Sequence, residues 1–386
     1  MTPEGTDPRE ATPLRGALGR ALARVAAPMY GVAIGVQNWR FDRGIGVGRA
    51  AVPVVSVGNL TAGGTGKTPL VVWLSRELRV RGLRPAVALR GYRPIARPAG
   101  AGGDGALILG RWSDEVDELH RALPGTPIVA RARRLEGIEE LLEADARRRA
   151  GTAEKAIDVV ILDDGFQHRR LARDFDLVVI DSTRDPRRDE LLPAGWLREP
   201  VESLSRAQAV VLNRFDEANA EHLSLRRDLA DRLSAPIFCA GGAWAGIQGV
   251  PGVELAPVSF LEGKRLVVAC GIGNPAAFLR QVRAAAGSSA RAGREGAGAV
   301  TALFYPDHHA YPKRSVYEIA GAAERERADA IVVTDKDWSK LRLLPAATWP
   351  CAMVRPLLTM SVDGGAILVD RVEAAIRGSA ARSTRR

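Results

Sequence analysis

The 386-residue chain is predicted to be an α/β protein with two α/β/α domains of the P-loop or Rossmann-like type. Three observations predict this. Short apolar, β-branched runs alternate with helical stretches, which is typical of a doubly wound, mostly parallel sheet. A glycine-rich loop stands between the first of these runs and a helix. The length and the 46% hydrophobic fraction are sufficient for two cores.

The alternation continues along most of the chain and indicates three regions. Residues 1–50 are expected to form an N-terminal tail and an amphipathic helix, and residues 51–220 a larger nucleotide-binding domain with a mostly parallel sheet. Residues 221–386 are expected to form a smaller α/β domain. This last domain is predicted from four further apolar runs, at 237–240, 265–269, 300–305 and 330–334.

The first apolar run, residues 52–57, leads into a loop that predicts nucleotide binding. The loop and the helix start after it contribute Gly63, Gly64, Thr65, Gly66, Lys67 and Thr68. Loop amides and the helix N-terminus bind phosphate, the lysine reaches the outer phosphates, and the threonine hydroxyl can ligate Mg²⁺. The strict P-loop pattern has glycine where this chain has Thr61, so the loop is a variant.

Two carboxylates complement this loop. The apolar run at 157–162 ends in Asp163 and Asp164. A strand of this kind lies beside the P-loop strand and delivers an acid to Mg²⁺. We therefore expect Thr68, Asp163 and Asp164 at the metal.

The composition favours an anionic partner. Lysine and arginine number 55 against 45 acidic residues, a net charge of +10, which suits a nucleotide, a nucleic acid or an anionic membrane surface. The chain contains no nucleic-acid-binding module that we recognise, so we do not expect nucleic acid. Three scattered cysteines without a CxxC pair argue against a disulfide framework and a zinc site.

The N-terminal region carries an amphipathic pattern. Apolar residues recur at three- and four-residue steps from Leu14 to Val36, with Arg20 and Arg24 on the opposite side. The 15 uncharged positions between Arg24 and Arg40 are fewer than the ~20 needed to cross a bilayer. A helix lying on an anionic membrane surface is the favoured interpretation. A helix packed on its own domain is the alternative.

Seven sequence blocks resemble one family. They are SVGNLTAGGTGKTP, LRGY, ILDDGFQHRRLARD, LLPAGWLREP, ACGIGNP, YPDHHAY and TDKDWSKL, in this order between residues 52 and 341. The chain is similar in these blocks to the tetraacyldisaccharide 4′-kinases of lipid A biosynthesis. The resemblance implies transfer of the ATP γ-phosphate to the 4′-hydroxyl of a tetraacylated glucosamine disaccharide 1-phosphate, giving lipid IVA. It also implies a peripheral or monotopic protein at the cytoplasmic face of the bacterial inner membrane, in which the smaller domain closes over the active-site cleft. No obligate protein partner is evident from the sequence.

The resemblance also implies roles for individual residues. The catalytic group is Asp114, His308, Arg133 and Arg198, and the substrate-binding residues are Tyr92 and Glu199. Asp114 is the expected general base, oriented by His308. Its neighbours Ser113 and Val116 depart from the family pattern, which leaves open that Asp114 is only a favourable charge at a helix N-terminus.

Two further alternatives remain. Ala132 replaces the aspartate of the family's Asp-Arg pair, so Arg131 and Arg134 compete with Arg133 for its role. At the level of function, a membrane-associated P-loop ATPase or GTPase that acts as a switch or maturation factor could carry the same loop. That alternative predicts release of free phosphate without a lipid acceptor.

Overall fold

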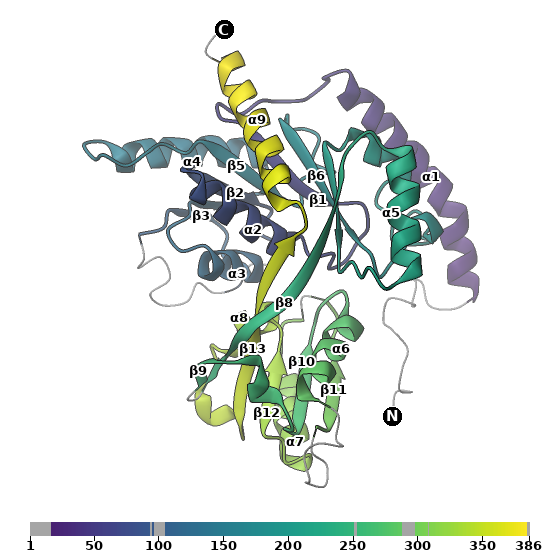
Figure 1. The fold of residues 1–386 in the computed structure, drawn as a ribbon, viewed down its shortest axis with the longest axis vertical. Helices are drawn as coiled ribbons and strands as arrows, with labels where there is room; N and C mark the ends of the chain where they lie inside the picture. Colours follow the sequence, from purple (N-terminus) through teal and green to yellow (C-terminus); the bar gives the residue numbers. More distant parts are fainter. Residues whose placement is uncertain are drawn as a thin grey trace. The chain divides into compact units, whose positions relative to one another are not determined.

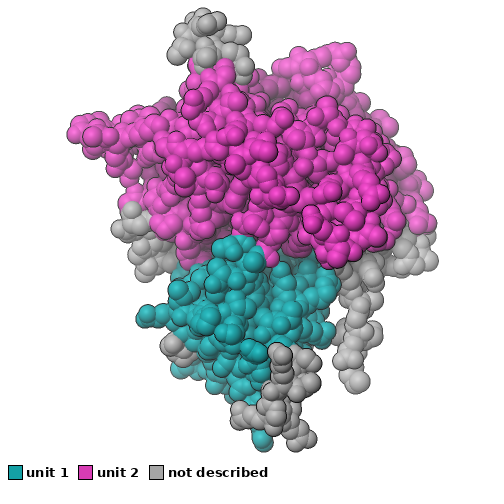
Figure 2. All heavy atoms as spheres, in the orientation of Figure 1, with its two compact units in different colours: residues 1–10, 243–359 teal, residues 11–242, 360–386 magenta. Residues whose placement is uncertain are grey.

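The structure is a computed structural model that describes residues 17–92, 95, 105–250, 253–287, 298–307 and 309–383. The tail expected at the N-terminus and His308 lie outside these residues. Two compact units are present (Figure 2). The described residues 17–242 and 360–383 form the larger unit, and those between 243 and 359 form the smaller one. The chain passes between the units within β8 (Ile237–Val250) and β13 (Ala352–Val362).

The larger unit is built on a parallel sheet (Figure 1). Its strand order is β8-β7-β6-β1-β5-β2-β4-β3, and each neighbouring pair in it is parallel. The bounds are β1 Val54–Asn59, β2 Pro85–Leu89, β3 Ile108–Gly110, β4 Ile128–Ala130, β5 Val159–Asp163, β6 Phe175–Asp181 and β7 Ala209–Asn213. The predicted α/β class and mostly parallel sheet are confirmed.

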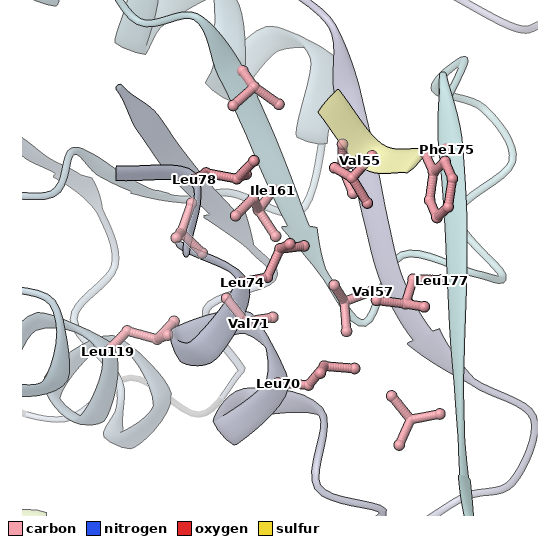
Figure 3. Close-up of a cluster of buried hydrophobic side chains, with 14 of the residues drawn as sticks. Val55, Val57, Leu70, Val71, Leu74, Leu78, Leu119, Ile161, Phe175 and Leu177 are labelled. Carbon is pink, nitrogen blue, oxygen red and sulfur yellow. The ribbon is translucent and has the colours of Figure 1, made fainter. Parts of the chain in front are cut away.

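Helices cover both faces of this sheet, because alternate strand residues point to opposite sides. On one face Val55, Val57 and Ile161 pack against α2 (Lys67–Val80) and α3 (Asp114–Ala122) (Figure 3). On the other face Val54 and Val160 pack against α4 (Arg134–Arg149), and strands β6 and β7 pack against α5 (Ala220–Arg232). The larger unit is therefore an α/β/α layer structure that holds the P-loop strand in its middle.

The last helix, α9 (Gly365–Ser383), belongs to the larger unit. Leu368, Val369, Val372 and Ile376 lie in the same buried cluster as the apolar side chains of α2 and β1. This placement differs from the expected division at residue 220, which assigned the whole C-terminal region to the smaller domain. The apolar face of α9 covers the sheet beside α2, where it completes the core around the P-loop helix.

The smaller unit has the same layers around a shorter sheet. Strands β10 (Leu266–Cys270), β11 (Val300–Phe304), β12 (Ala330–Val333) and β13 are parallel in the order β11-β10-β12-β13, and β9 (Val253–Ala256) pairs antiparallel with β8. The helices α7 (Lys313–Arg325) and α8 (Asp335–Leu341) cover one face, and α6 (Pro275–Ala286) covers the other.

Helix α1 (Ala17–Asp42) presents its apolar stripe outward. The exposed members of this stripe are Leu22, Val25, Met29, Val32, Val36 and Trp39. The opposite side carries small residues, Ala23 and Ala27, which are buried against Ala194. The stripe is thus not the surface by which α1 packs on its own unit. Within the described residues, none of the helices has the length and apolar character needed to cross a bilayer.

Candidate functional site

The loop between β1 and α2 has the shape of an anion cradle. Gly63 and Gly66 have φ angles of 109° and 90°, which residues with a Cβ rarely adopt. A Cβ at Gly66 would stand 2.1 Å from Nδ2 of Asn213. Gly66 is also the N-cap of α2 and contributes no side-chain hydrogen bond to the first turn. The backbone amides at the start of α2 can therefore donate to a phosphate.

Two buried asparagines hold this loop from the sheet side. Nδ2 of Asn59, at the end of β1, donates to the carbonyl oxygen of Thr61 at 2.6 Å and to Oγ1 of Thr65 at 3.0 Å. Nδ2 of Asn213, at the end of β7, donates to the carbonyl oxygen of Thr65 at 2.9 Å. Neither asparagine was predicted from the sequence as part of the site. Each is an amide residue that directly ends an apolar strand, and this sequence feature could have identified it.

The acidic pair lies beside the loop, as its position in the sequence predicted. In the parallel register of β1 and β5, Asp163 is the partner of Val57, and its side chain is buried. Asp164 has a φ of 54° and turns toward the loop, where Oδ1 lies 3.5 Å from Nζ of Lys67. Nη1 of Arg198 donates to both oxygens of Asp164, at 2.9 and 3.0 Å.

The charge of Asp164 is fixed by these cations. Burial opposes ionisation of this carboxyl, but Lys67 and Arg198 outweigh burial and hold the pKa of Asp164 well below its usual range. The carboxylate is therefore ionised at any physiological pH. The Asp164 carboxylate is thus shared between Lys67 and Arg198, and both cations reach the phosphate-binding loop.

The segment that carries Arg198 is itself paired with the P-loop. The amide of Arg198 donates to the carbonyl oxygen of Leu60 at 2.9 Å, and the amide of Ala62 donates to that of Trp196 at 2.8 Å. These two hydrogen bonds frame an antiparallel bridge between Thr61 and Leu197. The backbone positions of Arg198 and of the phosphate loop are consequently coupled.

Glu199, expected to bind substrate, is buried and only 1% exposed. Its Oε1 accepts from Nε2 of Gln167 at 3.1 Å. Its Oε2 accepts from Nη2 of Arg206 at 2.8 Å and from Nδ2 of Asn38 at 2.9 Å. Through these hydrogen bonds, the Glu199 carboxylate links three parts of the chain. They are α1, which carries Asn38, the segment after β5, which carries Gln167, and the segment that carries Arg206.

The three arginines after β4 have different surroundings. Arg131 pairs with Glu140, and Arg133, whose side chain is 82% exposed, pairs with Glu136 at 2.8 Å. Arg134 is buried at 5% exposure. Burial and Arg90 lower the pKa of Arg134, whereas the charges of Asp164 and Asp163 raise it. Nη1 of Arg134 also donates to the carbonyl oxygens of Arg131 and Ala132, at 3.1 and 3.0 Å.

The comparisons with known proteins identify the family. The model of the family described as "Tetraacyldisaccharide-1-P 4'-kinase" matches residues 19–372. A tetraacyldisaccharide 4′-kinase of Chlorobaculum parvum is 35% identical over 334 residues, 85% of this chain and 86% of that protein. One of Anaeromyxobacter dehalogenans is 35% identical over 337 residues, 86% and 83% of the respective chains. This chain belongs to the tetraacyldisaccharide-1-P 4′-kinase family.

A solved structure agrees with the fold of this 4′-kinase family member. It is described as the "apo" form of LpxK from Aquifex aeolicus in complex with ATP. The two chains superpose with a TM-score of 0.64 at 23% sequence identity, over 92% of this chain and 99% of that one. The agreement concerns the fold alone.

The other residues expected in the site of a 4′-kinase are Asp114, Tyr92 and His308. Asp114 is the first residue of α3, 1% exposed, with Ser113 as the helix N-cap. The charge of Glu115, its neighbour, acts on Arg134 together with those of Asp163 and Asp164. Tyr92 is 48% exposed and lies under the guanidinium of Arg90. His308 lies outside the described residues, so its partnership with Asp114 stays a prediction.

Proposed function

We propose that this family member transfers the γ-phosphate of ATP to the 4′-hydroxyl of a tetraacylated glucosamine disaccharide 1-phosphate at a membrane surface. Membership of the family makes the chain an ATP-dependent kinase of lipid A biosynthesis. The observation that carries the proposed mechanism is the convergence of Lys67, Asp164 and Arg198 beside a loop shaped for phosphate.

The phosphates of ATP are bound by the loop. Amides from Gly63 to Thr68 and the N-terminus of α2 face the anion, and Lys67 neutralises its outer oxygens. Asn59 and Asn213 keep the loop in this shape through side-chain hydrogen bonds. Asn59 donates to Thr61 and Thr65, and Asn213 donates to Thr65.

The residues present also fit Mg²⁺. The Thr68 hydroxyl and the Asp163 carboxylate are buried oxygen donors on α2 and β5, two elements that pack on one another, and Asp164 follows directly. Hard oxygen donors of this kind suit Mg²⁺, which keeps several of its waters. When bound, the metal supplies charge neutralisation on the transferred phosphoryl group.

Arginines stabilise charge on the phosphoryl oxygens during transfer. Phosphoryl transfer depends on positioning and electrostatic stabilisation more than on covalent chemistry. Arg198 reaches the site from the segment paired with the P-loop. Of the arginines after β4, we assign the second role to Arg134, because it is buried and the charges of Asp163 and Asp164 act on it, whereas Arg133 faces solvent.

The general base is assigned to Asp114, with His308 as its orienting partner. A sugar hydroxyl is a weak nucleophile, and a carboxylate that accepts its proton contributes about 10²- to 10⁴-fold. The family resemblance carries this assignment. Asp114 is buried at the start of α3, where its Oδ1 accepts from the amide of Glu115 at 3.1 Å. Asp164 is less suited to this role, since it is bound by two cations.

A lipid substrate agrees with the surface of α1. The exposed stripe from Leu22 to Trp39 is the apolar face that a helix lying in a bilayer interface presents to acyl chains. Arg24, Arg40 and Arg43 lie along the same helix or just after it, where cations attract an anionic leaflet. We place the protein at the cytoplasmic face of the inner membrane, where ATP is available.

The test is the identity of the product. The purified protein is incubated with Mg²⁺, ATP and a defined tetraacylated disaccharide 1-phosphate in mixed micelles, and the lipid is analysed by mass spectrometry and phosphorus NMR. A new monoester on the 4′-oxygen is expected. Phosphate on another hydroxyl would overturn the assigned position. Release of free phosphate with unmodified lipid would favour the ATPase or GTPase switch.

A further inference from the structure

Helix α1 has a polar inner face besides its exposed apolar stripe. Tyr30 and Asn38 lie on this inner face, eight residues and about two turns apart. The Tyr30 hydroxyl donates to the carbonyl oxygen of Arg198 at 2.9 Å. Nδ2 of Asn38 donates to Oε2 of Glu199 at 2.9 Å. Two consecutive residues of one segment are thus bound from a single helix.

The orientation of the Asn38 amide is set by a second partner. Nη1 of Arg169 donates to Oδ1 of Asn38 at 3.1 Å and to its carbonyl oxygen at 3.2 Å. An amide whose oxygen accepts from a guanidinium presents its NH₂ group to the other side. That side is occupied by the buried Glu199 carboxylate, so both ends of the Asn38 side chain are used.

The same two-residue segment contacts the phosphate site on its other side. Its backbone pairs with Leu60 in the P-loop, and the Arg198 guanidinium binds Asp164, which also contacts Lys67. A displacement of the Arg198 backbone would move its guanidinium relative to the transferred phosphoryl group. Misplacement of a positioned group by about 1 Å can cost about 10²-fold in rate.

We infer that Tyr30 and Asn38 are positioning residues for phosphoryl transfer, which hold Arg198 and Glu199 in register with the P-loop. This inference rests on the proposed role of Arg198. It gives α1 a function beyond contact with lipid: its inner face is part of the framework of the phosphate site.

The variants are Tyr30→Phe and Asn38→Ala. The matched controls are Tyr317→Phe, which removes an exposed hydroxyl on α7, and Gln37→Ala, which removes the exposed amide next to Asn38. Loss of one hydrogen bond predicts a fall in kcat of about three- to tenfold for each variant, with the KM for ATP unchanged. The controls should keep wild-type kcat. A wild-type kcat in both variants would overturn the inference.

Two comparisons separate positioning from other roles. In an Arg198→Lys background, Tyr30→Phe should change kcat less than about twofold, because both residues act through one guanidinium. Fully multiplicative losses would show that Tyr30 acts elsewhere. The loss should also be equal with acceptor in detergent micelles and in vesicles. A loss confined to vesicles would mean that these residues serve membrane binding.

Hydrogen exchange tests the inference independently of any substrate. The amides of Ala62 and Arg198 form the two hydrogen bonds between the segment and the P-loop. Both should exchange faster in Tyr30→Phe than in Tyr317→Phe, because a weakened segment opens more often. Equal exchange would contradict the inference. An inactive wild-type protein would contradict the proposed function instead, and the exchange result would still decide on positioning.

Discussion

Nη1 of Arg198 donates to both carboxylate oxygens of Asp164, at 2.9 and 3.0 Å. Lys67 lies 3.5 Å from one of the same oxygens. In the proposed mechanism, the phosphates of ATP bind the same two cations. Asp164 therefore holds Lys67 and Arg198 next to each other and keeps both ready for the nucleotide, and the first prediction follows from this arrangement.

Lys67→Ala and Asp164→Asn should each lower kcat by about 10²-fold or more, because each removes one charge from a preorganised site. Asparagine is chosen at Asp164 since it tolerates the positive φ of 54° there. Thermal unfolding should stay close to wild type in both. Lys313→Ala, at an exposed position in the smaller unit, is the control. Normal turnover in either site variant would contradict the P-loop assignment.

The second prediction distinguishes two adjacent arginines. Arg134→Lys should lower kcat by about 10-fold or more, since a lysine cannot reproduce the buried planar guanidinium that donates to the carbonyl oxygens of Arg131 and Ala132. Arg133→Ala should change kcat less than about twofold, because this side chain is 82% exposed and pairs only with Glu136 among the interactions described. Steady-state kinetics of the two variants decides which arginine belongs to the site. Thermal unfolding of each variant checks that it is folded. The reverse pattern would restore Arg133 to the site.

Arg133 and Arg134 show which part of the site could not be predicted from the sequence. The glycine loop, Lys67 and Thr68 were predictable because a local pattern of strand, loop and helix determines their geometry. Arg133 and Arg134 are the N-cap and the first residue of α4. Successive helix positions differ by about 100° in direction, so an error of one residue in the helix start exchanges the buried and the exposed arginine.

Two other features depended on contacts between distant segments. The apolar residues of α9 could be recognised from the sequence, but the sheet that they cover is formed by strands far earlier in the chain. Likewise, the family resemblance assigned Glu199 to substrate binding, which stays a prediction, and in the structure its carboxylate accepts from side chains of the protein itself. That Asn38, 161 residues earlier, would bind it could not be deduced from local patterns.

The third prediction concerns the general base. Asp114→Asn and His308→Ala should each lower kcat by about 10²-fold with the affinity for ATP nearly unchanged, because Asp114 is the proposed base for the acceptor hydroxyl and His308 acts through Asp114. The double variant should be little worse than the more impaired single one. Independent, multiplicative losses would show that the two residues do not act as a unit. An active Asp114→Asn would leave Asp114 as a helix N-terminal charge.

The fourth prediction concerns the apolar stripe of α1. Replacing Val25, Met29 and Val32 by serine removes side chains that are 68–72% exposed and do not form the inner face. Partitioning into vesicles that contain anionic lipid should fall by about tenfold or more, with ATP binding unchanged. The control replaces the exposed Leu255 and Leu358 of the smaller unit by serine. Full sedimentation of the stripe variant with vesicles would show that α1 is not the main membrane contact.

The most direct test of the central claim is the balance between ADP formed and phosphate transferred. ADP and phosphorylated lipid are measured in one reaction, with and without the disaccharide acceptor, and with Lys67→Ala as the blank. A kinase built on Lys67, Asp164 and Arg198 predicts equal amounts of ADP and lipid phosphate, and negligible ADP when the acceptor is omitted. Rapid ADP formation without acceptor, accompanied by free phosphate, would contradict it.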